Sequence, residues 1–211
     1  MYKKIDIQNW SRKAHFEFFK EFSQPFFGIT APLDCTELKS ATKKSGVSLY
    51  LSYLHKSLLA ANRIEEFRLR LTGDEVILFN EVSASPTVLR PDNTFGFGYF
   101  PFRENFENFA ELAQKELARV AARTDLEPAI KGEAVIHYTA IPWLSFTQIK
   151  HPSHDGFKNS IPKISFGKIY NSNGREMLPV SVEVHHALMD GYHVGKYFEL
   201  LQELFDSRTC E

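Results

Sequence analysis

The sequence predicts an α/β (α+β) protein, in which helices pack on a mixed, largely antiparallel sheet in two layers. Two observations predict this class. Segments with apolar residues at helical spacing occur between short strand-like segments, without the strict strand–helix–strand alternation of a parallel sheet. A turn-forming segment, Asn171–Gly174, also separates two apolar runs, so Lys163–Ile169 and Leu178–Val184 are expected to form a hairpin.

The expected helices follow from apolar periodicity and from residues suited to helix starts. Thr36 and Glu37 offer a cap and an acidic first turn, so a helix is expected from Asp34 or Thr36 onward. Leu51, Leu54 and Leu58 repeat at helical intervals. The other predicted helices are Trp10–Phe19, Ser48–Asn62, Phe106–Arg123 and Gly195–Phe205.

The expected strands are short runs rich in β-branched and aromatic residues, bounded by turns. Thr72-Gly73-Asp74 is such a turn, and it separates the first two of them. Besides the hairpin strands, the predicted strands are Phe67–Leu71, Glu75–Asn80, Ser85–Leu89, Thr94–Phe100 and Ala134–Ala140.

Composition limits the classes of function. The chain has 211 residues without a Gly-, Ser- or Pro-rich linker, so one domain over residues 1–211 is expected. A net charge of −1 disfavours a nucleic-acid partner, and no apolar run is long enough for a membrane span. The N-terminus lacks the apolar core of a signal peptide, and only Cys35 and Cys210 are cysteines, so a reducing cytoplasm is expected. The 19 Phe residues require burial in a core, a pocket or an interface.

Two adjacent histidines end the apolar strand that begins near Val180. An aspartate follows the second histidine by four residues, and a glycine comes next. Three interpretations are open. The pair is structural, with Asp190-Gly191 as a turn. Alternatively, His186, Asp190 and His193 converge on a metal, although no distant third ligand of the usual kind is evident. Finally, one histidine is a general base, since histidine is largely neutral at cellular pH.

The segment His185–Gly191 matches the HHxxxDG signature of coenzyme A-dependent acyltransferases. Three further blocks make the chain similar to chloramphenicol acetyltransferases of the trimeric type. Asn9–Phe18 resembles the family's W-x-R-x-x-H-F-E-F block, Asn62–Arg68 its N-x-x-x-E-F/L-R segment, and Thr139–Trp143 its S-A-x-P-W block. The resemblance spans the chain in order and at similar spacing, and it implies the CoA-dependent acyltransferase fold.

The resemblance implies roles for five residues. His186 would be the general base, and Asp190 would support the site by pairing with Arg12. Thr139 would replace the family's serine as the hydroxyl that stabilises the oxyanion. Ser165 would replace the family's threonine, which orders a water near the transition state. No metal is implied.

The resemblance also implies an aromatic acceptor pocket that departs from the family pattern. Phe19 stands where the family has a tyrosine, and Phe97 where it has a small residue. Phe27 and Phe95 match aromatic positions, and His137 replaces a neutral amide. Core packing is the alternative for each phenylalanine, and a satisfied buried histidine is the alternative for His137.

The implied activity is acetyl transfer from acetyl-CoA, the cosubstrate, to the primary hydroxyl of chloramphenicol. The implied assembly is a homotrimer with active sites between subunits, in which His186 meets its neighbour's pocket. Antibiotic resistance is the associated role. The alternatives are another hydroxylated small molecule as acceptor, which Phe19 and Phe97 favour, and a non-catalytic CoA- or ligand-binding relative.

Overall fold

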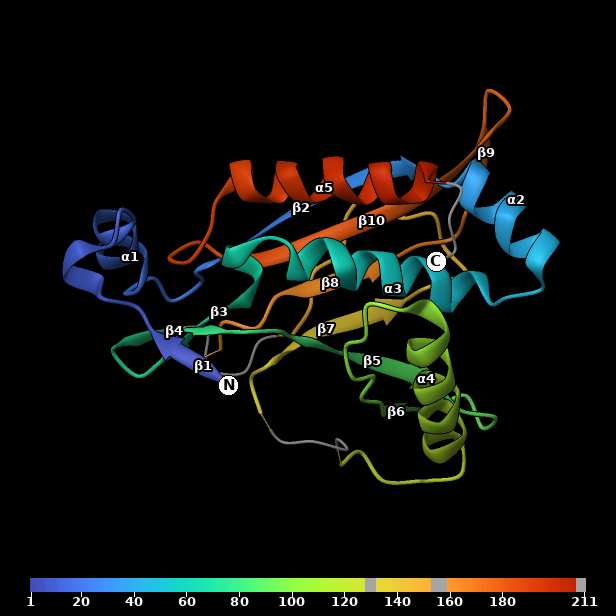
Figure 1. Cartoon of the computed structure of the whole chain (residues 1–211), viewed down its shortest axis with the longest axis horizontal. Coiled ribbons are helices and arrows are strands. Elements are labelled where there is room, and N and C mark those ends of the chain that lie inside the picture. Colours follow the sequence, from blue (N-terminus) through green and yellow to red (C-terminus); the bar gives the residue numbers. More distant parts are fainter. Residues whose placement is uncertain (128–131, 153–158, 208–211) are drawn as a thin grey trace.

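The computed structural model describes residues 1–127, 132–152 and 159–207. Figure 1 shows the elements in space. Within these residues the helices are α1 (Lys13–Phe19), α2 (Thr36–Ser45), α3 (Leu49–Asn62), α4 (Phe106–Ala121) and α5 (Gly191–Asp206), with single 3₁₀ turns η1 (Ile7–Asn9) and η2 (Glu65–Arg68). The strands are β1 (Tyr2–Lys4), β2 (Phe26–Asp34), β3 (Leu69–Thr72), β4 (Glu75–Phe79), β5 (Ser83–Leu89), β6 (Phe95–Phe97), β7 (Val135–Ala140), β8 (Lys163–Phe166), β9 (Tyr170–Ser172) and β10 (Arg175–His185).

The strands form a main sheet and a small second sheet. The main sheet has the order β2-β10-β8-β7-β5-β6, and β9 also pairs with β10. Only β5–β7 and β7–β8 are parallel among its described strand pairs, so the mixed, largely antiparallel sheet predicted from the sequence is confirmed. The small sheet has the order β1-β4-β3 and lies beside α1 (Figure 1).

The predicted turn at Asn171–Gly174 is present, but it does not join the two predicted strands directly. Asn173 and Gly174 have φ of 52° and 82°, the left-handed conformation that a tight turn needs. The turn connects β9 with β10, because Arg175 pairs with Ser172. β8 still pairs antiparallel with β10 further along the strand, with Val180 opposite Phe166.

Helix boundaries follow local capping. α1 begins at Lys13 rather than Trp10, since residues 7–9 form a 3₁₀ turn that the backbone N–H of Trp10 closes. α5 begins at Gly191, four residues before the predicted Gly195. Asp190 caps its N-terminus by accepting from the backbone N–H of Tyr192, and His193 completes a capping box. The caps therefore extend α5 up to the histidine loop.

The two faces of the main sheet differ in polarity. α3 and α5 lie against each other across one face (Figure 1). On β10, Val180, Val182 and Val184 are fully buried on that side. Ser181, Glu183 and His185 alternate with them and point to the opposite face. The main hydrophobic core therefore lies between the sheet and these two helices, while the other face carries hydroxyl and charged groups.

A second, smaller core fixes the loop that follows β10. Ala187 and Leu188 are fully buried there against Phe16 of α1 and residues of the small sheet such as Leu71. This packing ties the histidine loop to α1, which is distant in sequence.

Cys35 is buried, and Cys210 lies outside the described residues. Across the part of the chain that the structure describes, no helix is long and apolar enough to cross a membrane.

Candidate active site

His186 lies in the tight turn between β10 and α5. Its backbone N–H donates to the carbonyl of Pro25 at 2.8 Å, just before β2. The N–H groups of Leu188 and Met189 donate to the carbonyl of His185 and close the turn. Among the described residues, the buried Nδ1 of His186 has no hydrogen-bond partner. Nε2 is therefore the ring nitrogen available to a substrate.

Two phenylalanines hold the imidazole of His186. The ring of Phe19, at the end of α1, stacks on it with centroids 3.9 Å apart and planes 4° from parallel. Phe27 of β2 contacts it at 4.6 Å and 44°. Such apolar contacts restrict the imidazole and shield it from water. The structure thus brings together His186, Phe19 and Phe27 of the predicted site.

Asp190 and Arg12 also meet. Nη1 of Arg12 donates to Oδ2 of Asp190 at 2.7 Å. Burial would raise the pKa of Asp190, but the hydrogen bond from Arg12 and the nearby charges of His193 and Arg12 outweigh it and lower that pKa. Asp190 also caps α5, and Arg12 directly precedes α1. The ion pair therefore joins the start of α1 to the start of α5, close to the loop that carries His186.

The residues of the metal alternative do not converge. Nδ1 of His193 lies 3.0 Å from Asp190 and Nε2 lies 3.3 Å from Glu66, whereas the imidazole of His186 lies between aromatic rings. Within the described ranges no group of three or more histidine, cysteine, aspartate or glutamate side chains is arranged to hold a metal. The geometry favours a structural role for His193.

His185 points away from His186, as alternation along a strand requires. Its ring packs edge-on against Phe26 at 5.4 Å, and its Nδ1 accepts from the backbone N–H of Ala187. Burial, with a smaller effect from His186, lowers the pKa of His185 to about 4. His185 is therefore a neutral, structural member of the pair.

Thr139 and Ser165 lie opposite each other on the parallel strands β7 and β8. Both belong to the polar face of the sheet, since their neighbours Tyr138 and Ile164 are buried in the main core. His137 is on the same face of β7, opposite Lys163. Burial, aided by the charges of Arg70 and Lys163, lowers the pKa of His137 to about 4.

Within one chain, these hydroxyls do not meet His186. Ser165 pairs with Ser181, which precedes His186 by five residues. At about 3.3 Å per residue, His186 lies roughly 16 Å farther along the strand direction. Its contact with Phe27, which pairs with the core residue Val184, also places it toward the opposite face.

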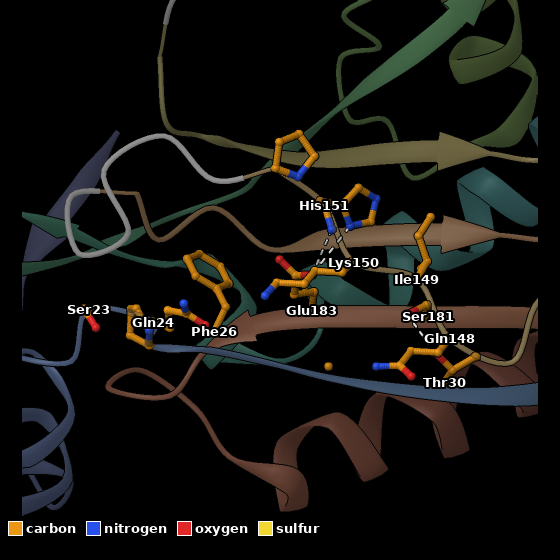
Figure 2. Close-up of a pocket in the computed structure, with 13 residues that line it drawn as sticks. Ser23, Gln24, Phe26, Thr30, Gln148, Ile149, Lys150, His151, Ser181 and Glu183 are labelled. Carbon is orange, nitrogen blue, oxygen red and sulfur yellow. Dashed lines mark hydrogen bonds and ion pairs between the residues drawn. The ribbon is translucent and has the colours of Figure 1, made fainter.

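The polar face lines a cavity of 580 Å³, and one lining residue, His151, lies within hydrogen-bond distance of Ser165. Figure 2 shows its wall, formed by β2, β10 and residues 148–152. The lining comprises Ser23, Gln24, Pro25, Phe26, Gly28, Thr30, Gln148, Ile149, Lys150, His151, Pro152, Ser181 and Glu183. Eight of these thirteen residues are polar or charged, so the cavity offers a ligand several hydrogen-bonding groups beside its apolar surface.

An ionic cluster at this cavity was not predicted from the sequence. Glu183 of β10 accepts from Nζ of Lys163 at 2.8 Å, and its other oxygen lies 3.6 Å from Nδ1 of His151. The available signal was Glu183 itself, a carboxylate inside an otherwise small or apolar alternating strand. Its partners were not evident, because strand pairing and a loop bring them to it.

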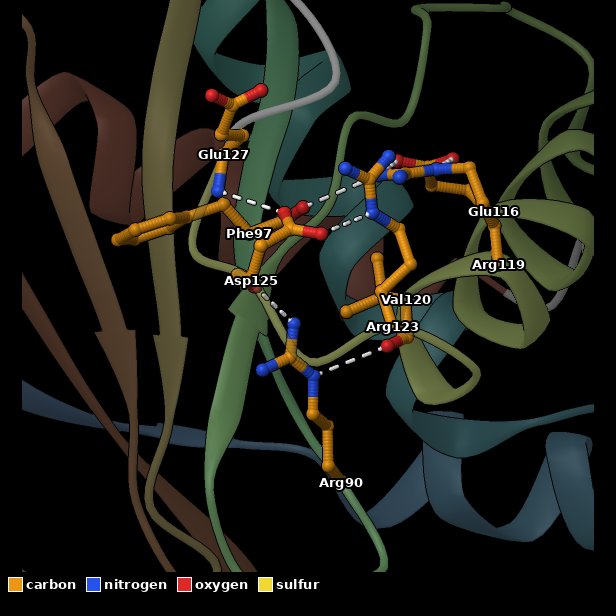
Figure 3. Close-up of polar contacts among 8 residues, drawn as sticks. All are labelled: Arg90, Phe97, Glu116, Arg119, Val120, Arg123, Asp125 and Glu127. Carbon is orange, nitrogen blue, oxygen red and sulfur yellow. Dashed lines mark hydrogen bonds and ion pairs between the residues drawn. The ribbon is translucent and has the colours of Figure 1, made fainter.

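Phe95 and Phe97 lie away from His186, on the edge strand β6. Their rings contact each other edge-on at 5.5 Å, and Phe95 is 45% exposed. Figure 3 shows β6 beside α4, where the carbonyl of Phe97 accepts from Arg119 at 3.5 Å. Neither residue lines the cavity described above.

The backbone resembles acyltransferases of known structure. The dihydrolipoamide acetyltransferase of Azotobacter vinelandii superposes with a TM-score of 0.66 at 18% identity, covering 92% of this chain and 86% of that one. A chloramphenicol acetyltransferase superposes with a TM-score of 0.89 at 29% identity, covering 98% of this chain and all of that one. The fold is therefore that of an acyltransferase.

Sequence comparison identifies the particular family. The family profile described as chloramphenicol acetyltransferase matches residues 1–202. Chloramphenicol acetyltransferase 3 of Escherichia coli is 30% identical over 209 residues, which cover 98% of each chain. The Campylobacter coli chloramphenicol acetyltransferase is 31% identical over 208 residues, covering 97% of this chain and 99% of that relative. The chain belongs to the chloramphenicol acetyltransferase family, a family of acyltransferase enzymes.

Proposed function

We propose that this protein is an acetyl-CoA-dependent O-acetyltransferase that acetylates the primary hydroxyl of chloramphenicol. The observation that carries the proposal is the imidazole of His186, held between Phe19 and Phe27 with Nε2 available, in a chain of this family. As general base, Nε2 removes the proton of the acceptor hydroxyl while the oxygen attacks the thioester carbonyl of acetyl-CoA. The acetyl group passes directly to the acceptor, and coenzyme A leaves as the thiol.

The hydroxyl of Thr139 supplies a donor for the oxyanion of the tetrahedral intermediate. A donor placed in this way contributes about 3 kcal/mol to transition-state stabilisation. Ser165, beside it on β8, orders a water near the same atoms. Asp190 and Arg12 hold the loop of His186 without contacting the substrate.

The reacting groups come together between subunits of a homotrimer. Because His186 lies roughly 16 Å along the strands from the row of Ser165 and Thr139, one chain alone does not assemble them. A second copy whose polar sheet face meets the histidine loop supplies the missing groups. The acceptor then binds against the polar cavity wall. His137, Phe95 and Phe97 lie outside that wall, and we expect them to contact the acceptor only where it extends beyond the cavity.

The decisive experiment is an assay of thiol release from acetyl-CoA in the presence of chloramphenicol. The wild type is expected to release thiol, and His186→Ala to lose at least about a thousandfold in kcat. His185→Ala, the matched control, removes the neighbouring imidazole that points away. Equal rates for wild type and His186→Ala would contradict the assignment of the base.

A second candidate acceptor is another hydroxylated small molecule with more polar groups than chloramphenicol. The ionised wall formed by Glu183 and the polar lining of the cavity favour it, together with the missing tyrosine hydroxyl at Phe19. A panel of hydroxylated acceptors at equal concentration decides between the two. Higher kcat/KM for a polar acceptor than for chloramphenicol would favour the second candidate.

The chain functions as a single domain in the cytoplasm, where acetyl-CoA is available, and it confers resistance to chloramphenicol. Expression in a sensitive host tests this role, with the His186→Ala variant as control. Resistance that persists in the variant would contradict it.

A further inference from the structure

A buried chain of polar groups ends at the hydroxyl of Ser165. Its Oγ lies 3.0 Å from Nε2 of His151. Nδ1 of the same imidazole is buried and has no hydrogen-bond partner among the described residues; it lies 3.6 Å from Oε2 of Glu183, an electrostatic contact beyond hydrogen-bond distance. The backbone N–H of His151 donates to that oxygen at 3.4 Å. The other carboxylate oxygen accepts from Lys163 at 2.8 Å. Figure 2 shows His151 and Glu183 facing each other at the cavity wall.

The charge of Glu183 sets the direction of hydrogen bonding in this chain. Burial alone would raise its pKa, but the contacts from His151 and Lys163 outweigh burial and lower the pKa to about 2. An ionised carboxylate beside Nδ1 attracts an N–H dipole and repels a lone pair. A neutral His151 therefore carries its proton on Nδ1 and presents a lone pair at Nε2.

We propose that His151, oriented by Glu183, is a positioning residue that fixes the hydroxyl of Ser165. The O–H of Ser165 donates to Nε2 of His151, so the oxygen lone pairs remain free to accept from a water or from the acceptor hydroxyl. This inference rests on the proposed role of Ser165 in the acetyl transfer.

Burial makes this orientation effective. Ser165 is 0% exposed, and the side chains of Lys163 and Glu183 are 7% and 10% exposed. Away from water, a hydrogen bond to a fixed partner selects one hydroxyl rotamer more strongly than it does at the surface. His151 also lines the 580 Å³ cavity, so the imidazole that orients this hydroxyl lies at the cavity wall.

The same face of the sheet carries a second pair of hydroxyl groups, which hydrogen-bond to each other rather than to a histidine. Thr30 of β2 donates to Ser181 of β10 at 2.9 Å, and Ser181 is 3% exposed. Ser181 also lies beside Ser165 in the sheet. Because Ser181 lines the cavity proposed for the acceptor, it is not a suitable control. Ser52 of α3 is, since it is also 3% exposed, donates to the carbonyl of Ser48 and lies outside that cavity.

The first test is independent of activity. Nitrogen-15 NMR of the full protein with labelled histidine, assigned with a His151→Gln variant, reports which ring nitrogen carries the proton. The Nδ1–H tautomer is expected for His151 in the wild type, and Glu183→Gln is expected to populate the other tautomer. A wild-type His151 with its proton on Nε2 would overturn the proposal.

The second test is a kinetic double-mutant cycle with acetyl-CoA and the best acceptor. Ser165→Ala and His151→Leu are each expected to lower kcat about tenfold, or about 1.4 kcal/mol, with little change in KM. The double variant is expected to match Ser165→Ala in kcat, because His151 acts on the chemical step through that hydroxyl. His151→Gln, which keeps a side-chain acceptor, should recover part of the loss, and Ser52→Ala should stay near wild type.

The outcomes separate this inference from the proposed function. Additive losses, about a hundredfold in the double variant, would overturn the positioning role while leaving the reaction intact. A wild-type kcat in Ser165→Ala would remove the role of Ser165 and this inference with it. Only the comparison of wild type with His186→Ala addresses the reaction itself.

Discussion

Arg12 and Asp190 are 178 positions apart in the sequence, yet Nη1 of Arg12 donates to Oδ2 of Asp190 at 2.7 Å. The other nitrogens of this guanidinium, Nε and Nη2, are buried and have no partner among the described residues. Within the described residues Asp190 is therefore the hydrogen-bonded counter-charge of Arg12, while Glu66 is near enough for the charge of Arg12 to help lower its pKa. The Arg12–Asp190 pair holds α1, which carries Phe19, against the start of α5, and so it determines where the imidazole of His186 lies.

Asp190→Asn should destabilise the protein although it keeps an oxygen for the cap of α5. The substitution leaves the largely buried Arg12 without its hydrogen-bonded counter-charge, at an expected cost of about 1–3 kcal/mol in the free energy of unfolding. Urea unfolding measures this cost. Arg175→Met is the control, because it removes an ion pair with Asp34 in which Arg175 is 71% exposed, and such pairs contribute about 0–1 kcal/mol. If both substitutions lowered the free energy of unfolding equally, the Arg12–Asp190 pair would be no more important than an exposed ion pair.

Phe19→Leu should lower kcat clearly while changing the free energy of unfolding little. The stacked ring at 3.9 Å restricts the imidazole of His186, and an aromatic contact of this kind contributes about 0.5–1.5 kcal/mol. We expect kcat to fall about threefold to tenfold, measured by thiol release. Phe19→Tyr keeps the ring and should retain activity. If Phe19→Leu kept the kcat of the wild type, the stack would have no part in catalysis.

If the active sites lie between subunits of the proposed homotrimer, mixed trimers should recover activity that each inactive parent lacks. In a random mixture of His186→Ala and Thr139→Ala subunits, about a quarter of the sites combine an intact histidine with an intact threonine from the neighbour. Co-expression with two affinity tags isolates these mixed trimers, and thiol release measures the recovery. No recovery above the two parents would show that both residues act within one subunit.

Stability should fall as the pH is lowered from about 6.5 to 4. Burial lowers the pKa values of His185 and His137 to about 4, below the ordinary value of 6.5, so the unfolded chain binds more protons in this window. Their stabilisation is therefore complete above pH 6.5 and is lost as the pH falls towards 4. Between these two pKa values, each histidine contributes up to about 1.4 kcal/mol per pH unit to the slope of the free energy of unfolding against pH.

Urea unfolding at several pH values measures this slope. His185→Gln and His137→Gln should each make it shallower, whereas replacement of the exposed His15 should not. An unchanged slope in both buried variants would mean that other groups cause the acid sensitivity.

Arg70→Met should be among the most destabilising single substitutions. The guanidinium is 0% exposed and donates to the backbone carbonyls of Phe67, Leu69, Glu133 and Val135. Without these donors, the buried carbonyls lose their partners, at a cost of about 3 kcal/mol or more. Arg123→Met, which removes an exposed pair with Asp125, should change the urea midpoint little. A midpoint shift for Arg70→Met as small as for Arg123→Met would contradict this role.

Arg70 also illustrates the limits of the sequence pattern. In the alternation of residues 67–71, Phe67, Leu69 and Leu71 form the apolar set, which leaves Arg70 on the side expected to face solvent. Residues 65–68 instead form a 3₁₀ turn, and Arg70 is enclosed by residues near the start of β7. Local periodicity carries no information about such a distant enclosing segment.

The sequence by itself determined the fold class, the family and the histidine loop. These features rest on local order: apolar spacing, caps and a seven-residue motif that folds as one turn. Only the tertiary structure brought Phe19 onto His186, and Glu183 between Lys163 and His151. Those contacts depend on strand register and on the docking of α1, because residues far apart along the chain become neighbours only when the sheet pairs and the two cores pack.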